Sequence, residues 1–180
     1  MNASLQRWFG VGEVSWRQLV MFKAGWFGLV LAPSYSALLI SLLLVWFIWQ
    51  LQLQQRYALF TLWGSGVLLD LVFTFSGLFE FDSAWLPYWL VLLWGWFSLF
   101  WVTVFSRWLQ HSVLVALFGL IGGPMAYWGG AQLSDSLQIA SGAAFWLSLA
   151  PAWALLLLWS RHAETWLQRQ YQNRRTHHAG

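Results

Sequence analysis

The chain has 180 residues, of which 59% are hydrophobic and 8% are charged, and its mean hydropathy is +0.58. A soluble domain of this size could not bury so much apolar surface, so the composition excludes an ordinary water-soluble fold. The net charge of +3 is concentrated at the termini and in short connections, which argues against the continuous basic face of a nucleic-acid-binding protein.

The first 17 residues are of mixed character, because Leu5, Trp8 and Phe9 are interspersed with Arg7 and Glu13. Such a mixture is typical of a helix or loop that lies in the membrane interface. We therefore interpret residues 1–17 as an interfacial N-terminal segment.

Six mostly apolar stretches follow, at residues 18–33, 35–53, 57–78, 87–106, 112–132 and 139–160. Each approaches the length of about 20 residues with which a helix crosses a hydrocarbon core of about 30 Å. The pattern predicts an all-α fold, a polytopic transmembrane helical bundle of about six helices over residues 18–160. All nine Lys and Arg residues fit one orientation, with both ends in the cytoplasm (N-in/C-in) and only acidic residues in the outer connections.

The first stretch is short, contains Lys23 and ends at Pro33. An alternative interpretation is a cleaved signal peptide, with residues 24–32 as its apolar core and residues 34–37 as its cleavage region. We prefer a retained helix, because the polar leader is long and the supposed core contains Trp26. The other five spans keep their orientation in either case.

The third stretch contains Asp70, the only acidic residue deep inside a predicted span, where ionisable groups are costly and usually face protein or water. Gly66, Thr74 and Gly77 share its helix face, so another helix could approach closely there. At 1.5 Å per residue, Asp70 lies about 20 Å from the cytoplasmic edge and Lys23 about 8 Å, so we expect no direct ion pair. Without a nearby cation the neutral carboxyl group is favoured, and it could then donate a hydrogen bond.

The fifth stretch supplies a candidate acceptor at the same level as Asp70. Pro124 lacks an N–H and frees the carbonyl group of Leu120, while Gly122 and Gly123 precede it and Tyr127 follows it. Close helix packing is the preferred interpretation of the glycines, and a broken helix that lines a central site is the alternative. The fourth and sixth stretches could add an aromatic wall through Trp94 and Trp146. We expect Asp70, Tyr127, Gly122, Gly123, Pro124 and Trp94 to line a small polar pocket.

His111 and Ser112 stand at the cytoplasmic start of the fifth span, where they would mark the approach to this pocket. A His at such a position more often contacts headgroups or caps the helix than catalyses a reaction. The sequence shows no metal-ligand spacing, phosphate-binding glycine loop or nucleophile motif, so we expect no metal site and no cofactor.

The last 20 residues, 161–180, begin as a helical extension and end polar and basic. We interpret them as a basic cytoplasmic tail, for which anionic headgroups are a natural partner at about 1 kcal/mol per basic residue. A solvated end that only sets topology is at least as well supported.

Several segments resemble a bacterial inner-membrane family that is catalogued as a domain of unknown function. They are FKAGWFGLVLA at residues 22–32, the segment from Gly66 to Asp70, LPYWLVLLWGWF at 86–97 and, above all, LQHSVLVALFGLIGGPMAYWGGAQL at 109–133. The family often has Asn-His-Ser where this chain has Gln110, His111 and Ser112, which weakens any role for the first of these positions. Genes of such families often stand near cyclopropane-fatty-acid-synthase-like methyltransferases, so the resemblance implies a link to membrane lipid modification.

Three functions follow as hypotheses. The preferred one is a non-catalytic inner-membrane component that is accessory to lipid modification or envelope maintenance. The second is a small proton-linked transporter that uses Asp70, although few other polar groups mark a path. The third is an intramembrane lipid-modifying enzyme, which would need a second catalytic group beside Asp70. Membrane lipids are the expected partners, and the bundle could also pair with a second copy or with another membrane protein.

Overall fold

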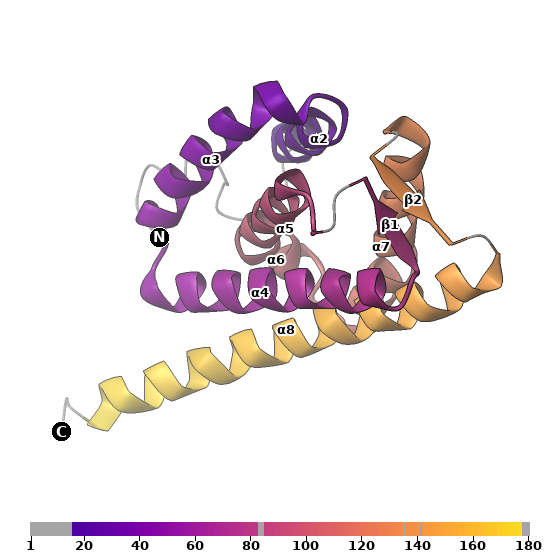
Figure 1. Ribbon diagram of the computed structural model, residues 1–180. Helices are drawn as coiled ribbons and strands as arrows, with labels where there is room; N and C mark the ends of the chain where they lie inside the picture. The colour runs from indigo at the N-terminus through magenta and orange to yellow at the C-terminus, as the bar shows by residue number, and fades with distance from the viewer. Residues whose placement is uncertain (1–15, 83–84, 135, 141, 178–180) are drawn as a thin grey trace.

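The computed structural model describes residues 16–82, 85–134, 136–140 and 142–177 (Figure 1), with side chains up to Trp166. The predicted interfacial segment therefore lies almost wholly outside the described residues. The main helices are α2 (Trp16–Leu31), α3 (Pro33–Gln50), α4 (Leu53–Phe75), α5 (Tyr88–Phe100), α7 (Ser112–Leu133) and α8 (Ala143–His177). These six helices confirm the predicted all-α bundle.

The fourth predicted span is the central element of the fold. It consists of α5, a π-helical turn η1 (Trp101–Phe105) and the short helix α6 (Ser106–Trp108). Its apolar window is 78% buried, whereas that of α3 is only 17% buried. Because this helix is apolar on every side, it can pack against neighbours all round, as a fully buried helix must.

The other helices surround this central span. α2, α3 and α4 pack directly on α5, and α7 and α8 pack along each other. In Figure 1, α4 and α8 lie side by side below α5 and α6, and the C-terminal part of α8 extends beyond the other helices. The last apolar stretch and the first part of the predicted tail thus form one continuous helix.

A two-stranded antiparallel sheet, which the sequence interpretation missed, joins the two long connections. β1 (Phe79–Phe81) pairs with β2 (Leu137–Ile139), with Phe79 opposite Ile139 and Phe81 opposite Leu137. The predicted sixth span began at Ile139, but that residue belongs to β2 and the helix starts at Ala143. The sheet turns Phe79 and Leu137 into the core, where both are buried.

Two arginines form hydrogen bonds to backbone carbonyl groups at helix ends, in connections that are predicted to be cytoplasmic. Arg56 donates from Nε to the carbonyl oxygen of Leu51 at 3.0 Å and from Nη2 to that of Trp49 at 2.5 Å. Arg161 of α8 donates to the carbonyl oxygens of Leu109 and Gln110, just after α6. The C-terminal carbonyl groups of a helix lack partners within the helix and favour a nearby cation, so both arginines stabilise these corners.

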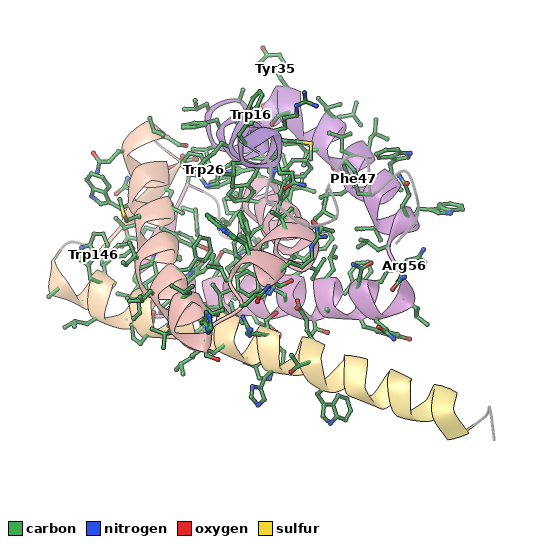
Figure 2. All side chains as sticks on the ribbon, turned by 180° about the vertical axis from the view of Figure 1, so that it is seen from behind. Trp16, Trp26, Tyr35, Phe47, Arg56 and Trp146 are labelled. Carbon is green, nitrogen blue, oxygen red and sulfur yellow. The ribbon has the colours of Figure 1, made fainter. Side chains whose placement is uncertain are left out.

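The outer surface of the bundle is largely apolar. Figure 2 shows Tyr35 pointing outward from α3. On the same helix Leu38, Leu42 and Trp49 are 59–78% exposed. Five helices are long and apolar enough to cross a membrane, namely α3, α4, the α5–α6 span, α7 and the apolar part of α8. The chain is therefore a multi-pass membrane protein, whose exposed apolar side chains face lipid.

The first predicted span differs from the other five. α2 has 16 residues, which corresponds to about 24 Å of helix and is shorter than a hydrocarbon core of about 30 Å. It is nevertheless part of the core, because Leu29 and Trp26 are buried and the indole nitrogen of Trp96 donates to the carbonyl oxygen of Phe22 at 3.2 Å. These contacts place α2 in the core of the bundle, and its retention stays a prediction.

Candidate functional site

The carboxyl group of Asp70 lies at the centre of the molecule, on α4, and the residue is 0% exposed. The indole Nε1 of Trp94, on α5, donates a hydrogen bond to its Oδ2 at 2.6 Å. The hydroxyl group of Tyr127, on α7, lies 2.6 Å from Oδ1 and 2.7 Å from Oδ2. Three helices are thus joined by one buried hydrogen-bonded group, which we call the Asp70 triad (Asp70, Trp94 and Tyr127).

A glycine one turn before Asp70 makes this approach possible. A Cβ atom at Gly66 would lie 2.1 Å from the ring of Trp94, so only glycine leaves room for the indole against α4. One turn after Asp70, the hydroxyl group of Thr74 donates to the backbone carbonyl of Asp70 at 2.8 Å, within the same helix. Of the predicted stripe of small residues, Gly66 brings Trp94 to the carboxyl group, whereas Gly77 lies in the turn after α4, with no atom within 4 Å of its Cβ position.

Aromatic rings enclose the triad. Trp153 of α8 stacks on Trp94 with ring centroids 4.7 Å apart, and Phe79 of β1 stacks on Tyr127 at 4.8 Å. Trp153 also meets Tyr127 edge-on at 6.1 Å. Offset stacked and edge-to-face pairs of this kind stabilise by about 0.5–1.5 kcal/mol beyond the area they bury. The rings and the small sheet therefore hold the two hydrogen-bond donors in place.

The glycines of α7 serve two different purposes. At Gly119 an added Cβ atom would lie 2.6 Å from the backbone of Ala154, and at Gly123 it would lie 2.3 Å from the ring of Trp153. Both glycines allow close packing of α7 on α8, as preferred from the sequence. At Gly122 the nearest atom, in the ring of Phe118, would be 3.8 Å away, so this glycine does not face a tight contact.

The alternative of a broken helix at Gly122, Gly123 and Pro124 was wrong. α7 runs from Ser112 to Leu133 as one helix with Pro124 inside it. The carbonyl group of Leu120 is also not the partner of Asp70, whose side chain is bonded to Trp94 and Tyr127. Packing of the flanking glycines against α8 stabilises the helix across the proline.

A cavity of about 320 Å³ lies on the other side of Trp94 and Tyr127, between α2, α5 and α7. This volume is at the lower end of the range of about 300–1,000 Å³ for small-molecule sites. Apolar and aromatic side chains form nearly all of its wall, and among the residues that the structure describes Lys23 is the only charged one in it. The lining residues are Leu19, Phe22, Lys23, Trp26, Val30, Trp89, Leu90, Leu93, Trp94, Phe97, Phe105, Trp108, Phe118, Gly122, Ala126, Tyr127, Gly130, Leu137 and Trp153.

The predicted site residues therefore fall into three groups. Trp94, Tyr127 and Gly122 line the cavity, whereas Asp70 lies behind the first two and does not. Gly123 and Pro124 are buried outside the lining. His111 and Ser112 are exposed at the start of α7 and do not line the cavity either.

One predicted member of the aromatic wall was wrong, and others were missed. Trp146 is 42% exposed at the periphery of the bundle (Figure 2). The position in the aromatic wall that was expected for Trp146 is occupied by Trp153. Phe145, Leu149, Trp153 and Leu157 are all buried and follow one another at steps of four along α8. The sequence did not single out this stripe, because the other faces of α8 are equally apolar. Phe79 was not predicted as part of the wall, because it lies in β1, and the sheet itself was not predicted.

The chemistry available here is limited. The triad contains one carboxyl group, one phenol and one indole, and the carboxyl oxygens already accept hydrogen bonds from both neighbours. Within the ranges that the structure describes, no three His, Cys, Asp or Glu side chains gather as a metal site would require. A ligand in the cavity would meet the rings of Trp94 and Tyr127 and would not reach Asp70.

Comparison with known proteins places the chain in a family. The model of a family described as protein of unknown function (DUF2878) matches residues 15–159. The chain belongs to the DUF2878 family. The match covers, up to residue 159, the five described helices that are long and apolar enough to cross a membrane, and it includes the triad and the cavity. It confirms the resemblance to a domain of unknown function. No curated protein and no solved structure matches the chain.

Proposed function

We propose that this DUF2878 protein is a non-catalytic component of the bacterial inner membrane that holds a membrane lipid and is accessory to lipid modification or envelope maintenance. The observation that carries the proposal is the two-sided wall made by Trp94 and Tyr127. Their polar atoms are bonded to Asp70, and the cavity on their other side has an almost entirely apolar lining. Such a wall suits a hydrocarbon chain and offers no reacting group to it.

The burial of Asp70 favours this function over the two alternatives. A proton-linked carrier needs a path of polar groups to its carboxyl group, and an enzyme needs a second catalytic group within hydrogen-bonding reach of the substrate. Asp70 is 0% exposed, and its hydrogen-bond partners are an indole and a phenol that tie helices together. The carboxyl group therefore acts best as a structural link.

Deletion and complementation of the gene test the proposal. We expect a changed lipid profile by mass spectrometry when the gene is deleted, and restoration of the normal profile by the wild-type chain. Asp70→Asn should restore it equally well, because an amide can still accept from Trp94 and exchange a hydrogen bond with Tyr127. An unchanged lipid profile after deletion would contradict the accessory role.

The same experiment separates the carrier from the accessory protein. If Asp70 cycles protons, Asp70→Asn should fail to complement although the protein accumulates at its normal level.

A reporter fused after Gly180 tests the proposed orientation, because the distribution of Lys and Arg predicts a cytoplasmic C-terminus. A periplasmic reporter would overturn that orientation.

A further inference from the structure

We propose that the cavity between α2 and α7 is the binding site for one chain of an anionic phospholipid, whose phosphate group is held by Lys23. The inference rests on the proposed function, to which it adds the place of the lipid, the group that recognises its headgroup and the class of lipid selected. It starts from a weakly closed side of the bundle. α2 packs mainly on α5 and α3, and it meets α7 over only a short distance.

The cavity occupies this weakly closed side. Gly122, Ala126 and Gly130 present a stripe of small residues on α7, at steps of four, to the cavity. Phe22 and Trp26 line it from α2. The terminal ring carbon of Trp26 comes within 4.0 Å of the Cβ position of Gly129, so one side chain bridges the two helices. The space left beside this bridge runs along the central helix α5.

Exposed apolar side chains lie beside the cavity-lining residues on both α7 and α2. On α7, the stripe next to the small residues consists of Ile121, Met125 and Trp128, which are 47–55% exposed. On α2, Phe27 is 43% exposed. Large exposed apolar side chains on a membrane protein face hydrocarbon, so a lipid chain could enter sideways without crossing water.

Charge complementarity selects the headgroup. Lys23 is exposed and is the only charged residue among the described residues of the lining. Within the described part of the chain no carboxylate pairs with it, and its Nζ atom lies 5.5 Å from the ring centroid of Trp26. A lysine on a flexible stem can extend toward the interface while its methylene groups cover apolar surface. An anionic phospholipid is the complementary partner, because no cation in its own headgroup offsets the charge of its phosphate group, whereas the choline of phosphatidylcholine does.

The predicted topology places this pair in a suitable leaflet. Lys23 lies in the cytoplasmic part of α2 if the N-terminus is inside, and the cytoplasmic leaflet carries the anionic surface that attracts basic residues. The cavity continues from Lys23 along α2 to Val30 and along α5 to Trp89, toward the outer ends of both helices. A lipid anchored at Lys23 would therefore extend one acyl chain into the apolar interior of the bundle.

Native mass spectrometry of the full chain in detergent micelles tests the site. The probes are dioleoyl phosphatidylglycerol and dioleoyl phosphatidylcholine, and the measured quantity is the fraction of protein that retains one lipid. We expect preferential retention of phosphatidylglycerol. Lys23→Gln should weaken that retention about five-fold, the effect of one basic residue near an anionic headgroup, and leave phosphatidylcholine unchanged. Lys23→Arg, which keeps the charge, should behave like the wild type.

A second pair of variants tests the cavity itself. Gly122→Leu places a side chain in the cavity and should reduce retention of both lipids. Gly64→Leu is the matched control, because Gly64 is an exposed glycine of α4 with no atom within 4 Å of its Cβ position. Thermal unfolding of each detergent-solubilised variant shows that it is folded, and Ala126→Leu replaces Gly122→Leu if the latter does not fold.

The outcomes separate this inference from the proposed function. Equal retention of the two lipids by the wild type, or no effect of Lys23→Gln, overturns the selection of a net anionic headgroup by Lys23. Equal retention by Gly122→Leu and Gly64→Leu, while the wild type keeps its lipid, overturns the cavity as the site and leaves a lipid-holding function intact. A wild-type chain that retains no lipid overturns both.

Discussion

Trp94 and Tyr127 separate two regions that differ in how tightly they are filled. On one side lies the Asp70 triad, where every polar side-chain atom has a partner and a glycine is needed for the rings to fit. On the other side lies the cavity, where Gly122 faces no tight contact and space remains. The same two rings are thus fixed by polar atoms on one side and available to a ligand on the other.

This difference teaches how a small membrane protein can keep an apolar site open. In a bilayer, apolar side chains gain little free energy by leaving lipid. The distances between helices must therefore be fixed by close packing and by hydrogen bonds. The triad supplies such a constraint at the centre of α4, α5 and α7. The region behind the rings should therefore tolerate little change, and the region in front of them should tolerate more.

The largest expected effect comes from filling the tightest contact of the triad. Gly66→Leu forces a side chain into the ring of Trp94, which an added Cβ atom would already approach to 2.1 Å. Overpacking costs about 1–3 kcal/mol or more, and here it should also break the hydrogen bond from Trp94 to Asp70. We expect loss of folded protein in size-exclusion chromatography after solubilisation.

Gly64→Leu, two residues away on an exposed face of the same helix, is the control for Gly66→Leu. It should elute like the wild type. Equal behaviour of the two variants would mean that α4 and α5 do not pack as closely as described, and the comparison between the two sides of the rings would fail.

Asp70→Leu is expected to have the next largest effect. It removes the acceptor for Trp94 Nε1 and for the hydroxyl group of Tyr127 and leaves both donors buried. An unsatisfied buried donor costs about 1–3 kcal/mol, so the melting temperature in detergent should fall markedly. Asp70→Asn keeps an acceptor in place and should cost much less. If both variants melt like the wild type, the triad does not hold the helices.

The sequence predicted the members of the triad through simple length arguments. Asp70 stood out because ionisable groups are rare in apolar helices, and counting residues from the ends of the spans placed Tyr127 and Trp94 at similar levels. The structure joins all three side chains. Their functional role, and that of His111 and Ser112, stays a prediction. The orientation of the bundle likewise rests on the positions of Lys and Arg.

Other features had no readable signal in the sequence. The α8 stretch is apolar on every face, so periodicity could not show that Trp153 is buried and Trp146 exposed. The strands β1 and β2 have three residues each and lie in connections between helices, where short strands give no period. The π-helical turn η1 depends on tertiary packing around α5, and the cavity depends on how α2 and α7 diverge.

The smallest expected effects come from two adjacent glycines of α7, and they contrast the two regions directly. Gly123→Ala brings a single methyl group within 2.3 Å of the Trp153 ring, so it should destabilise the protein by about 1 kcal/mol, the low end of overpacking. The methyl group added by Gly122→Ala would lie beside the cavity, where the nearest atom, in the ring of Phe118, is 3.8 Å away. Alanine is favoured over glycine within a helix by about 0.5–1 kcal/mol, so this variant should be slightly more stable than the wild type.

Thermal unfolding of the two single variants in the same detergent measures this contrast. Because the two residues are neighbours in one helix, differences in helix propensity cancel and only their surroundings remain. A lower melting temperature for Gly123→Ala together with an equal or higher one for Gly122→Ala would locate the boundary between tight packing and open space on α7. Equal destabilisation by both would mean that the cavity is closed at Gly122, and a lipid chain would then have no room beside α7.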